Sequence, residues 1–409
     1  MIDRNSGSLH GAVLPVLTLK QLDEDPHGVF GQYRKDHAVV LQETGGYFVL
    51  RLADVDRLGK DDPRSGPSGT SFPLALGVSS GAIFDLFTYS MITAEGDVHR
   101  RRRAPFSRLF ATRTINEMRQ SIRQTANALI GQWYGRGEMD YFGQFASELP
   151  ARMIADLLGL PRQDIPEFTL LVYEVTKIFS FGLNPDQIGK IENAARQLRD
   201  YVDKVLDERR RNPRDDFLSA FLAAAIEAGE LSPEEMLYQI MPLIIGSADT
   251  TRVALTMQVA LLLQHREQWA AVCDDPSLVP AAVTEAMRFE PSAAGTVRLA
   301  RENIDVGGSV IPAGQLVVLS IMSAMRDANA YRRPDMFDIH RTDQQRMHPI
   351  FGFGAHRCIG EALARAELEE SLRAITARIP HLQLDAAPKI RGHYGVRRID
   401  APMRVFWKP

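Results

Sequence analysis

The sequence predicts a mainly α-helical protein with a smaller β region. Two observations support this: apolar residues recur at helical spacing through the middle of the chain, and short β-like runs occur before residue 51 and over about 295–322. The helical patterns cover residues 99–134, 144–158, 163–181 and 187–211. Since no long linker, repeat or low-complexity tract interrupts the chain, we expect residues 1–409 to form a single domain.

The N-terminal β-like runs are expected to form a hairpin. Residues 39–42 and 47–50 are rich in β-branched and aromatic residues, and Glu43-Thr44-Gly45-Gly46 between them is typical of a turn. Residues 61–93, which follow, are rich in Gly, Ser and Pro. We therefore expect a long loop there, and loops of that length in compact domains are usually functional.

The clearest helix is expected to begin after Ser232 and to reach about Gln264. Ser232 is suited to the N-cap, Pro233 to the first turn, and Glu235 completes a capping box. Pro242 falls inside the pattern and predicts a kink or a break. Apolar residues surround most of the girth, so this helix should cross the core.

Residues 246–251 place an unusual polar group, Gly-Ser-Ala-Asp-Thr-Thr, in the middle of that helix. Ser, Asp and Thr compete with the helix backbone for hydrogen bonds, and such local costs are expected at functional sites. Gly246, Asp249 and Thr250 have the spacing of one helix face. The structural alternative is an N-cap at Ser247 or Asp249 that joins two shorter helices.

Composition excludes several classes of protein. The chain is 45% hydrophobic and 24% charged, and its formal net charge of −3 argues against general nucleic-acid binding. Two cysteines cannot make a disulfide framework, which fits a reducing cytoplasm. The N-terminus resembles neither a signal peptide nor an anchor, and the apolar run 253–263 is too short to span a bilayer. We therefore expect a cytoplasmic protein without a membrane anchor.

The most informative segment is Phe351-Gly352-Phe353-Gly354-Ala355-His356-Arg357-Cys358-Ile359-Gly360, directly before a helix-forming stretch. Glycines allow positive φ and a close approach to a flat ligand, and a helix N-terminus favours the thiolate of a nearby cysteine. A thiolate in such a loop suits an axial haem-iron ligand, which favours O–O cleavage. Alone, Cys358 would be interpreted as a small buried hydrophobe. A zinc site is disfavoured because Cys273 is the only other cysteine.

The spacing F-G-x-G-x-H-x-C-x-G resembles the haem-thiolate loop of the cytochrome P-450 family. The resemblance implies the P-450 fold, with the long central helix crossing the haem site, and haem b (iron protoporphyrin IX) as cofactor. Cys358 would then ligate iron, with cofactor contacts from other residues of this loop and from the central helix. These contact residues are Phe351, Gly352, His356, Gly360 and Gly246.

Two further motifs resemble elements of the same family. Residues 246–251 resemble its oxygen-activation motif, which implies that Thr250 stabilises activated oxygen and that Asp249 links it to solvent. Ser247 departs from the usual second glycine, and we expect it to alter the local water pattern. Glu285 and Arg288 resemble the family's E-x-x-R element, whose third partner would be Arg341, with a structural role beneath the haem.

The arginine-rich stretch 99–103 divides into two groups. His99 and Arg103, at i and i+4, resemble the family's haem-propionate clamp, to which the resemblance adds Arg298 and His356. Arg101 and Arg102 are interpreted as a solvated basic face. Alternatively these two arginines, with Arg108 and Arg357, would form a basic patch for an acidic electron donor.

Pocket residues follow from the resemblance alone, and are mainly apolar, as expected for a hydrophobic small molecule. Phe84 and Phe87 could equally be ordinary core residues. The candidates are Phe84, Phe87, Leu243, Ala248, Thr296, Val297 and Val396, with Phe181 as a further aromatic.

The resemblance implies a monooxygenase that inserts one atom of O₂ into such a substrate. The electrons would come from NAD(P)H through a reductase and a ferredoxin or flavodoxin. Three alternatives remain: a peroxide-driven enzyme, a ring-coupling oxidase on the same fold, and a non-catalytic haem protein that binds a gas. The intact Asp249-Thr250 pair argues against the first and disfavours the last.

Overall fold

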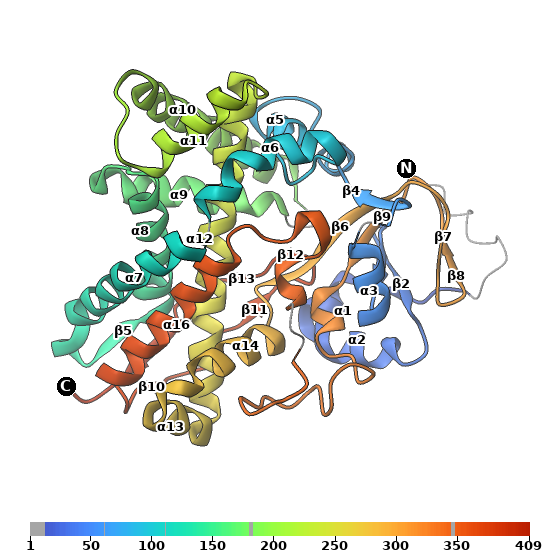
Figure 1. The fold of residues 1–409 in the computed structure, drawn as a ribbon. Coiled ribbons are helices and arrows are strands. Elements are labelled where there is room, and N and C mark those ends of the chain that lie inside the picture. Colours follow the sequence, from blue (N-terminus) through green and yellow to red (C-terminus); the bar gives the residue numbers. More distant parts are fainter. Residues whose placement is uncertain (1–12, 61, 111, 180–182, 345–347) are drawn as a thin grey trace.

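The computed structural model describes residues 13–60, 62–110, 112–179, 183–344 and 348–409. Helices dominate the part of the chain between residues 71 and 289, and most strands lie before or after it (Figure 1). The helices are α1 (Leu19–Glu24), α2 (Pro26–Arg34), α3 (Leu52–Gly59), α4 (Ser71–Ala75), α5 (Ala82–Tyr89), α6 (Gly96–Leu109), α7 (Thr112–Trp133), α8 (Glu148–Leu157), α9 (Ile165–Val175), α10 (Pro185–Arg211), α11 (Phe217–Ala228), α12 (Pro233–Gln264), α13 (Arg266–Asp274), α14 (Val279–Phe289), α15 (Ile321–Ala324) and α16 (Glu361–Arg378).

Short strands form several small sheets. The largest sheet has the order β1-β2-β3-β9-β6-β12, with β4 paired to β6. Its strands are β1 (Val16–Leu17), β2 (Val39–Gln42), β3 (Tyr47–Val49), β4 (Ser65–Pro67), β6 (Ala293–Ala300), β9 (Leu316–Leu319) and β12 (Gly395–Val396). The smaller sheets contain β5 (Glu138–Asp140), β7 (Ile304–Val306), β8 (Ser309–Ile311), β10 (Gln383–Leu384), β11 (Ile390–Arg391), β13 (Arg398–Ile399) and β14 (Arg404–Phe406).

The mainly helical prediction and the expected hairpin are confirmed. β2 and β3 pair antiparallel, with Val40 opposite Phe48. The expected loop over 61–93 was wrong, because it contains β4, α4 and α5. In neither α4 nor α5 does the side chain of the N-cap residue accept a hydrogen bond from the helix, so these short helices lack the local signal that marks a helix start in sequence.

The long helix α12 runs through the helical part of the molecule (Figure 1). Its predicted capping box is present: Glu235 N donates to Ser232 Oγ at 3.1 Å and Ser232 N donates to Glu235 Oε2 at 3.1 Å. The helix continues through Pro242 and through residues 246–251 without a break. Of the predicted kink or break at Pro242, the break was therefore wrong, and so was the alternative of two shorter helices joined at Ser247 or Asp249.

Burial on nearly all sides explains why α12 tolerates unfavourable residues. Its neighbours include α5, α8, α9, α10, α14 and α16, and most of its side chains are buried. Packing against so many elements outweighs weak local propensity, as is usual for core helices. One large hydrophobic cluster extends across these helices and reaches Phe48 of the main sheet.

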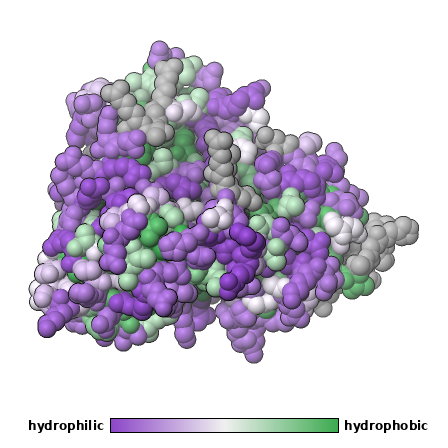
Figure 2. All heavy atoms as spheres, turned by 60° about the horizontal axis from the view of Figure 1, so that its bottom comes forward, coloured by the Kyte–Doolittle hydropathy of each residue, from purple (hydrophilic) through white to green (hydrophobic). Residues whose placement is uncertain are grey.

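The face shown in Figure 2 is mostly hydrophilic, with hydrophobic residues scattered in small areas. Among the described residues, no helix is both long and apolar enough to cross a membrane.

Candidate active site

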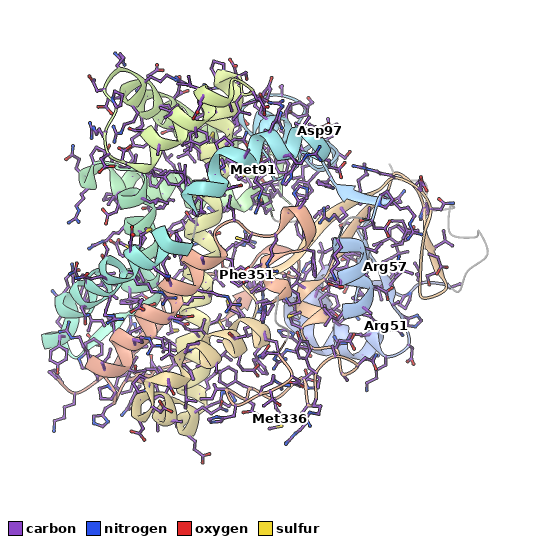
Figure 3. The ribbon with its side chains drawn as sticks, viewed as in Figure 1. Arg51, Arg57, Met91, Asp97, Met336 and Phe351 are labelled. Atoms are coloured by element: carbon purple, nitrogen blue, oxygen red, sulfur yellow. The ribbon has the colours of Figure 1, made fainter. Side chains whose placement is uncertain are left out.

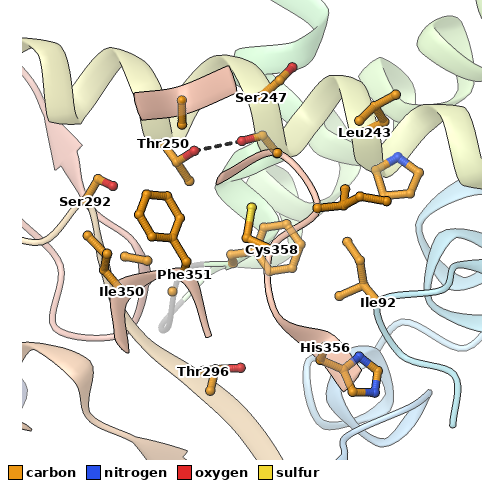
Figure 4. A pocket seen from close by; sticks show the side chains of 18 of the residues that line it. Ile92, Leu243, Ser247, Thr250, Ser292, Thr296, Ile350, Phe351, His356 and Cys358 are labelled. Carbon is orange, nitrogen blue, oxygen red and sulfur yellow. Dashed lines mark hydrogen bonds between the residues drawn. The ribbon is translucent and has the colours of Figure 1, made fainter. Parts of the chain in front are cut away.

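A cavity of about 430 Å³ lies between α12 and the loop that precedes α16. Phe351 of this loop lies near the centre of the molecule (Figure 3). Figure 4 shows the Cys358 side chain directed toward α12, on which Thr250 and Ser247 lie. Although Cys358 lies deep in the protein, its side chain is exposed, because it faces this cavity.

The cysteine loop is shaped by glycines with positive φ. Gly352 has φ +77° and Gly354 has φ +53°, conformations that other residues rarely adopt. Cys358 N donates to Phe351 O at 2.7 Å, which closes the loop. The loop therefore presents the sulfur at the start of α16, as the sequence predicted.

Burial and the helix N-terminus act in opposite directions on the pKa of the Cys358 thiol. Burial raises the pKa of its thiol, outweighing the opposing effects of the Gly360 N–H and of Arg103 and Arg357. The helix N-terminus therefore does not make a thiolate by itself. A metal ion that binds this sulfur must displace its proton.

Only some residues of the polar group at 246–251 on α12 face the cavity. Gly246, Ser247 and Thr250 line the cavity, and Thr250 Oγ1 donates to Gly246 O at 2.7 Å. Gly246 has open space where a Cβ would stand. Thr251 also lines the cavity, so the cavity-facing stripe extends further around the helix than we expected.

Asp249 does not join Thr250 at the cavity, contrary to the predicted shared face. Asp249 lies about 100° around the helix from Thr250, and its buried carboxylate forms an ion pair with Arg252. The Arg252 guanidinium lies 3.5 Å from the centre of the Tyr173 ring. The i, i+3 spacing of Asp249 and Arg252 is a signal in the sequence that could have predicted this pair.

Four basic side chains gather at one edge of the cavity: His99, Arg103, Arg298 and His356. The His99 and His356 rings lie 4.2 Å apart. Burial, together with neighbouring basic groups, lowers the pKa of His356 to about 3, and burial beside Arg103 lowers the pKa of His99. Both imidazoles are therefore neutral near pH 7, while the two guanidinium groups keep their charge.

These residues fit haem. His99 Nε2 is buried and has no hydrogen-bond partner among the described residues, and Arg103 and Arg298 each carry positive charge at the same edge. Two propionate groups require such donors and charges. Cys358 at the opposite wall from Gly246 and Thr250 offers the sulfur ligand, and the open space at Gly246 accommodates a flat ring.

The predicted Glu285–Arg288–Arg341 group is assembled in the core. Arg288 donates from Nε and Nη2 to both carboxylate oxygens of Glu285, at 2.7 and 2.8 Å, and Arg341 Nε lies 3.3 Å from Glu285 Oε2. Arg288 and Glu285 are 0% and 1% exposed. Arg288 also donates to backbone carbonyls at 325, 334 and 336, so it ties α14 to the segment after α15.

Arg101 and Arg102 do not form a solvated face. Arg101 donates to both Glu235 carboxylate oxygens, at 2.6 and 2.7 Å, and Arg102 Nε donates to Oε1 at 2.9 Å. Although burial opposes it, hydrogen bonds from Arg101, Ser232 and Arg102 lower the pKa of Glu235 to about 2. Both arginines therefore hold the start of α12. The sequence could not predict this contact, because Glu235 lies 133 or more residues away along the chain.

Arg101 and Arg102 are also not available for the alternative, a basic patch that binds an acidic electron donor. Arg102 is 7% exposed, and Arg101 is engaged with Glu235 on its guanidinium nitrogens. Arg357 pairs with Glu361 at 2.7 Å and donates to Gly352 O. The side chain of Arg108 lies outside the described residues.

Aromatic side chains form one wall of the cavity. Phe72 lies 5.5 Å from Phe87 and 5.9 Å from Tyr394, and Phe87 lies 5.9 Å from Phe179, between ring centres. Among the pocket candidates, Phe87, Leu243, Thr296 and Val297 line the cavity. Sequence analysis did not single out four other residues that line it: Phe110, which follows α6, and Ile154, Ala254 and Met287 from α8, α12 and α14.

Three pocket candidates are not among the described residues that line the cavity: Phe84, Ala248 and Val396. Phe84 packs against the hydrophobic core instead. Ala248 is buried on another side of α12. Gly395 lines the cavity, and because successive strand residues face opposite sides of a sheet, Val396 points away from it. Gly352 lines a second hollow behind the loop rather than this cavity, and Phe181 lies outside the described residues.

Glu367 was missed entirely by sequence analysis. It lines the cavity from α16, is 2% exposed, and its Oε2 has no hydrogen-bond partner among the described residues. Burial raises the pKa of its carboxyl to about 8, so the neutral acid predominates at pH 7. No sequence pattern distinguishes it from the solvent-exposed acids of an amphipathic helix.

Comparisons with known proteins agree with this geometry. The family model described as Cytochrome P450 matches residues 166–378. The plant-inducible cytochrome P450-pinF1 of Rhizobium radiobacter is 40% identical over 93% of this chain and 90% of its own length. The nocardicin C N-oxygenase of Nocardia uniformis subsp. tsuyamanensis is 33% identical over 73% and 74%. The crystal structure of epothilone D-bound cytochrome P450epoK superposes with a TM-score of 0.87 at 28% identity, over 96% of this chain and 98% of that one.

Proposed function

Because this chain belongs to the cytochrome P450 family, we propose that it inserts one oxygen atom of O₂ into an uncharged, mainly apolar small molecule. Membership makes the chain a P450 monooxygenase with a haem-thiolate cofactor. The substrate class rests on the cavity, whose wall contains Phe72, Phe87, Leu243 and Val297. Some relatives are named for their substrates, which are nocardicin C in one case and epothilones C and D in another. These substrates differ too much from one another to indicate the substrate of this chain.

One observation carries the proposal: Cys358 faces Gly246 and Thr250 across a cavity whose edge holds His99, Arg103, Arg298 and His356. Haem bound there supplies the activation of O₂. We propose that Cys358 ligates iron and that the four edge residues bind the propionates. Phe351 and Gly360 border the cofactor, and Gly246 leaves room for it on the α12 side.

Thr250 is the proposed catalytic hydroxyl. Its Oγ1 holds a proton that is donated to Gly246 O, and it faces the cavity directly above the cysteine loop (Figure 4). Asp249 is proposed to link Thr250 to solvent. Its carboxylate pairs with Arg252, whose side chain is 14% exposed, so the ion pair reaches solvent. The proposed proton path runs from solvent through Asp249 to Thr250, and it requires the Asp249 carboxylate to turn from Arg252 toward the cavity.

The proposal includes an external electron supply and a single-domain chain. Electrons are proposed to come from NAD(P)H through a reductase and a ferredoxin or flavodoxin, which is what membership of the family implies. Residues 1–409 are proposed to act as one P450 domain, supported by the 96% of the chain that superposes on the epothilone-binding enzyme.

The test uses the purified haem-loaded chain with a surrogate ferredoxin, its reductase and NAD(P)H. A library of neutral apolar compounds is screened for a low- to high-spin shift, and the compounds that cause it are incubated under ¹⁸O₂. The proposal expects one labelled oxygen atom in the product. Products formed only when hydrogen peroxide replaces NAD(P)H and O₂ would support the peroxide-driven alternative, and coupled products without label would support an oxidase.

A further inference from the structure

The helix α5, which forms part of the cavity wall, does not cap its own N-terminus. Its N-cap residue is Gly81, which has no side chain to accept the first amide protons. Instead, Ala82 N donates to Glu192 Oε1 at 2.7 Å and Ile83 N donates to Glu192 Oε2 at 3.0 Å. Glu192 belongs to α10, so one carboxylate on a distant helix satisfies two of the free N–H groups and complements the helix dipole.

Gly81 is shaped to admit this carboxylate. Its φ is +94°, and a Cβ at this position would stand 2.4 Å from Glu192 Oε1. Any other residue would therefore both strain the backbone and displace the carboxylate. The glycine at position 81 and the carboxylate of Glu192 are therefore both required for this contact.

The opposite end of α5 is anchored in the core. Gln239 of α12 accepts from Met91 N at 2.8 Å and donates to Tyr89 O at 2.7 Å, and it is 0% exposed. Arg102 donates to Thr88 O and Ser90 O. These buried anchors fix where α5 ends, whereas Glu192, which is only half-buried, fixes where it begins.

Between these two ends, α5 presents Phe87 to the cavity. The Phe87 ring contacts Phe72 from α4 and Phe179 from the segment between α9 and α10. α5 lies beside α10 and α12 in the fold (Figure 1). A shift at the N-terminus of α5 therefore moves an aromatic wall of the site but not the cysteine loop.

We propose that Glu192 is a positioning residue for the substrate site. By capping α5 from α10, its carboxylate sets the position of Phe87 and thereby the affinity for molecules that reach the aromatic wall. Ligands confined to the iron end of the cavity do not depend on it. The inference deepens the proposed function and rests on it only for the binding readout.

The test compares E192A and E192Q with D203N, which removes the carboxylate of the exposed Asp203 from the same helix. The haem-loaded chains are titrated spectroscopically with imidazole, which is confined to the iron end, and with 4-phenylimidazole, whose additional phenyl ring extends further into the cavity that Phe87 lines. Loss of a helix cap predicts about fivefold weaker 4-phenylimidazole binding by E192A. Imidazole affinity should change less than about twofold, and E192Q, which keeps one acceptor oxygen, should fall between.

Hydrogen exchange supplies a readout that does not require turnover. The amides of Ala82 and Ile83 should exchange faster in E192A than in D203N, while those of residues 89–91 remain protected. G81A should reproduce the selective loss of 4-phenylimidazole affinity, and G81A/E192A should lose less than the sum of both.

Equal 4-phenylimidazole affinities in E192A and D203N would overturn the positioning role, and unchanged amide exchange would overturn the cap itself. Equal losses for both azoles would also overturn the proposal, because they indicate general damage to the site. A wild-type chain that shows no haem-thiolate spectrum contradicts the proposed function instead, and the exchange measurement still tests the cap.

Discussion

Replacing Arg288 by alanine tests whether the buried charge group holds the core together. The substitution removes both hydrogen bonds to Glu285 and the donors that reach the carbonyls of Met325 and Pro334 at 2.8 Å. Glu285 keeps Asp338 N at 2.9 Å, Gln344 Nε2 at 2.8 Å and Arg341. The carboxylate therefore remains partly compensated after the change.

The expected loss of stability follows from this inventory. Removing one partner of a buried ion pair costs about 3–5 kcal/mol, and the three donors that remain on Glu285 favour the lower value. The carbonyls of Met325 and Pro334 lose a donor, which adds about 1 kcal/mol each, whereas Met336 O keeps Arg341 Nη2 as a donor at 3.2 Å. We expect R288A to lose about 5 kcal/mol, a large fraction of the roughly 5–15 kcal/mol by which folded proteins are stable.

The assay is urea unfolding of the haem-loaded protein, followed by far-ultraviolet circular dichroism. R152A is the matched control, because Arg152 pairs with Glu148 at 3.0 Å while their side chains are 33% and 44% exposed, and it should lose less than about 1 kcal/mol. Adding E285Q to R288A should recover about 1 kcal/mol, because it removes a buried charge that R288A leaves only partly compensated. A loss in R288A no larger than in R152A, or no recovery in the double variant, would refute the reasoning.

Three further predictions concern the cavity. C358S should lack the strongly red-shifted absorbance of the ferrous carbon monoxide complex, and an unaltered spectrum would remove the thiolate assignment. T250A should consume NAD(P)H with less product and more hydrogen peroxide, whereas unchanged product per NAD(P)H would contradict a role of this hydroxyl in proton delivery. Because burial raises the pKa of Glu367 to about 8 from 4.5, the folded state binds more protons than the unfolded state between these values, so stability should fall as pH rises from about 5 to 8. E367Q should flatten that slope in urea unfolding, and an identical slope in wild type would show that Glu367 does not titrate as expected.

The features predicted well from sequence depend on neighbouring residues or on a long motif. The Ser232–Glu235 capping box and the 39–49 hairpin are local, and the loop around Cys358 has a spacing that carries its own geometry. The basic residues His99 and Arg298 could be assigned only through the resemblance, since they lie on different elements that the fold brings to one edge of the cavity.

The missed features depend on partners that are distant in sequence. α5 was taken for loop because its cap is Glu192, 110 positions beyond Ala82. Arg101 was assigned to solvent because its partner Glu235 lies 134 residues away. Glu367 follows the same rule, because only the closed cavity shows that its side chain is buried.

The arrangement of α6 has a consequence for how this segment can change. Within five consecutive residues, His99 and Arg103 face the cavity edge while Arg101 and Arg102 grip Glu235 at the start of α12. One residue inserted after Arg100 would rotate everything beyond it by about 100°. Arg103 would leave the cavity edge, where we propose that it binds a haem propionate, and Arg101 and Arg102 would leave Glu235 at the same time. A substitution can affect the cavity edge or the contact with Glu235 separately, whereas an insertion or deletion affects both. We therefore expect α6 to tolerate substitutions far more readily than changes in length.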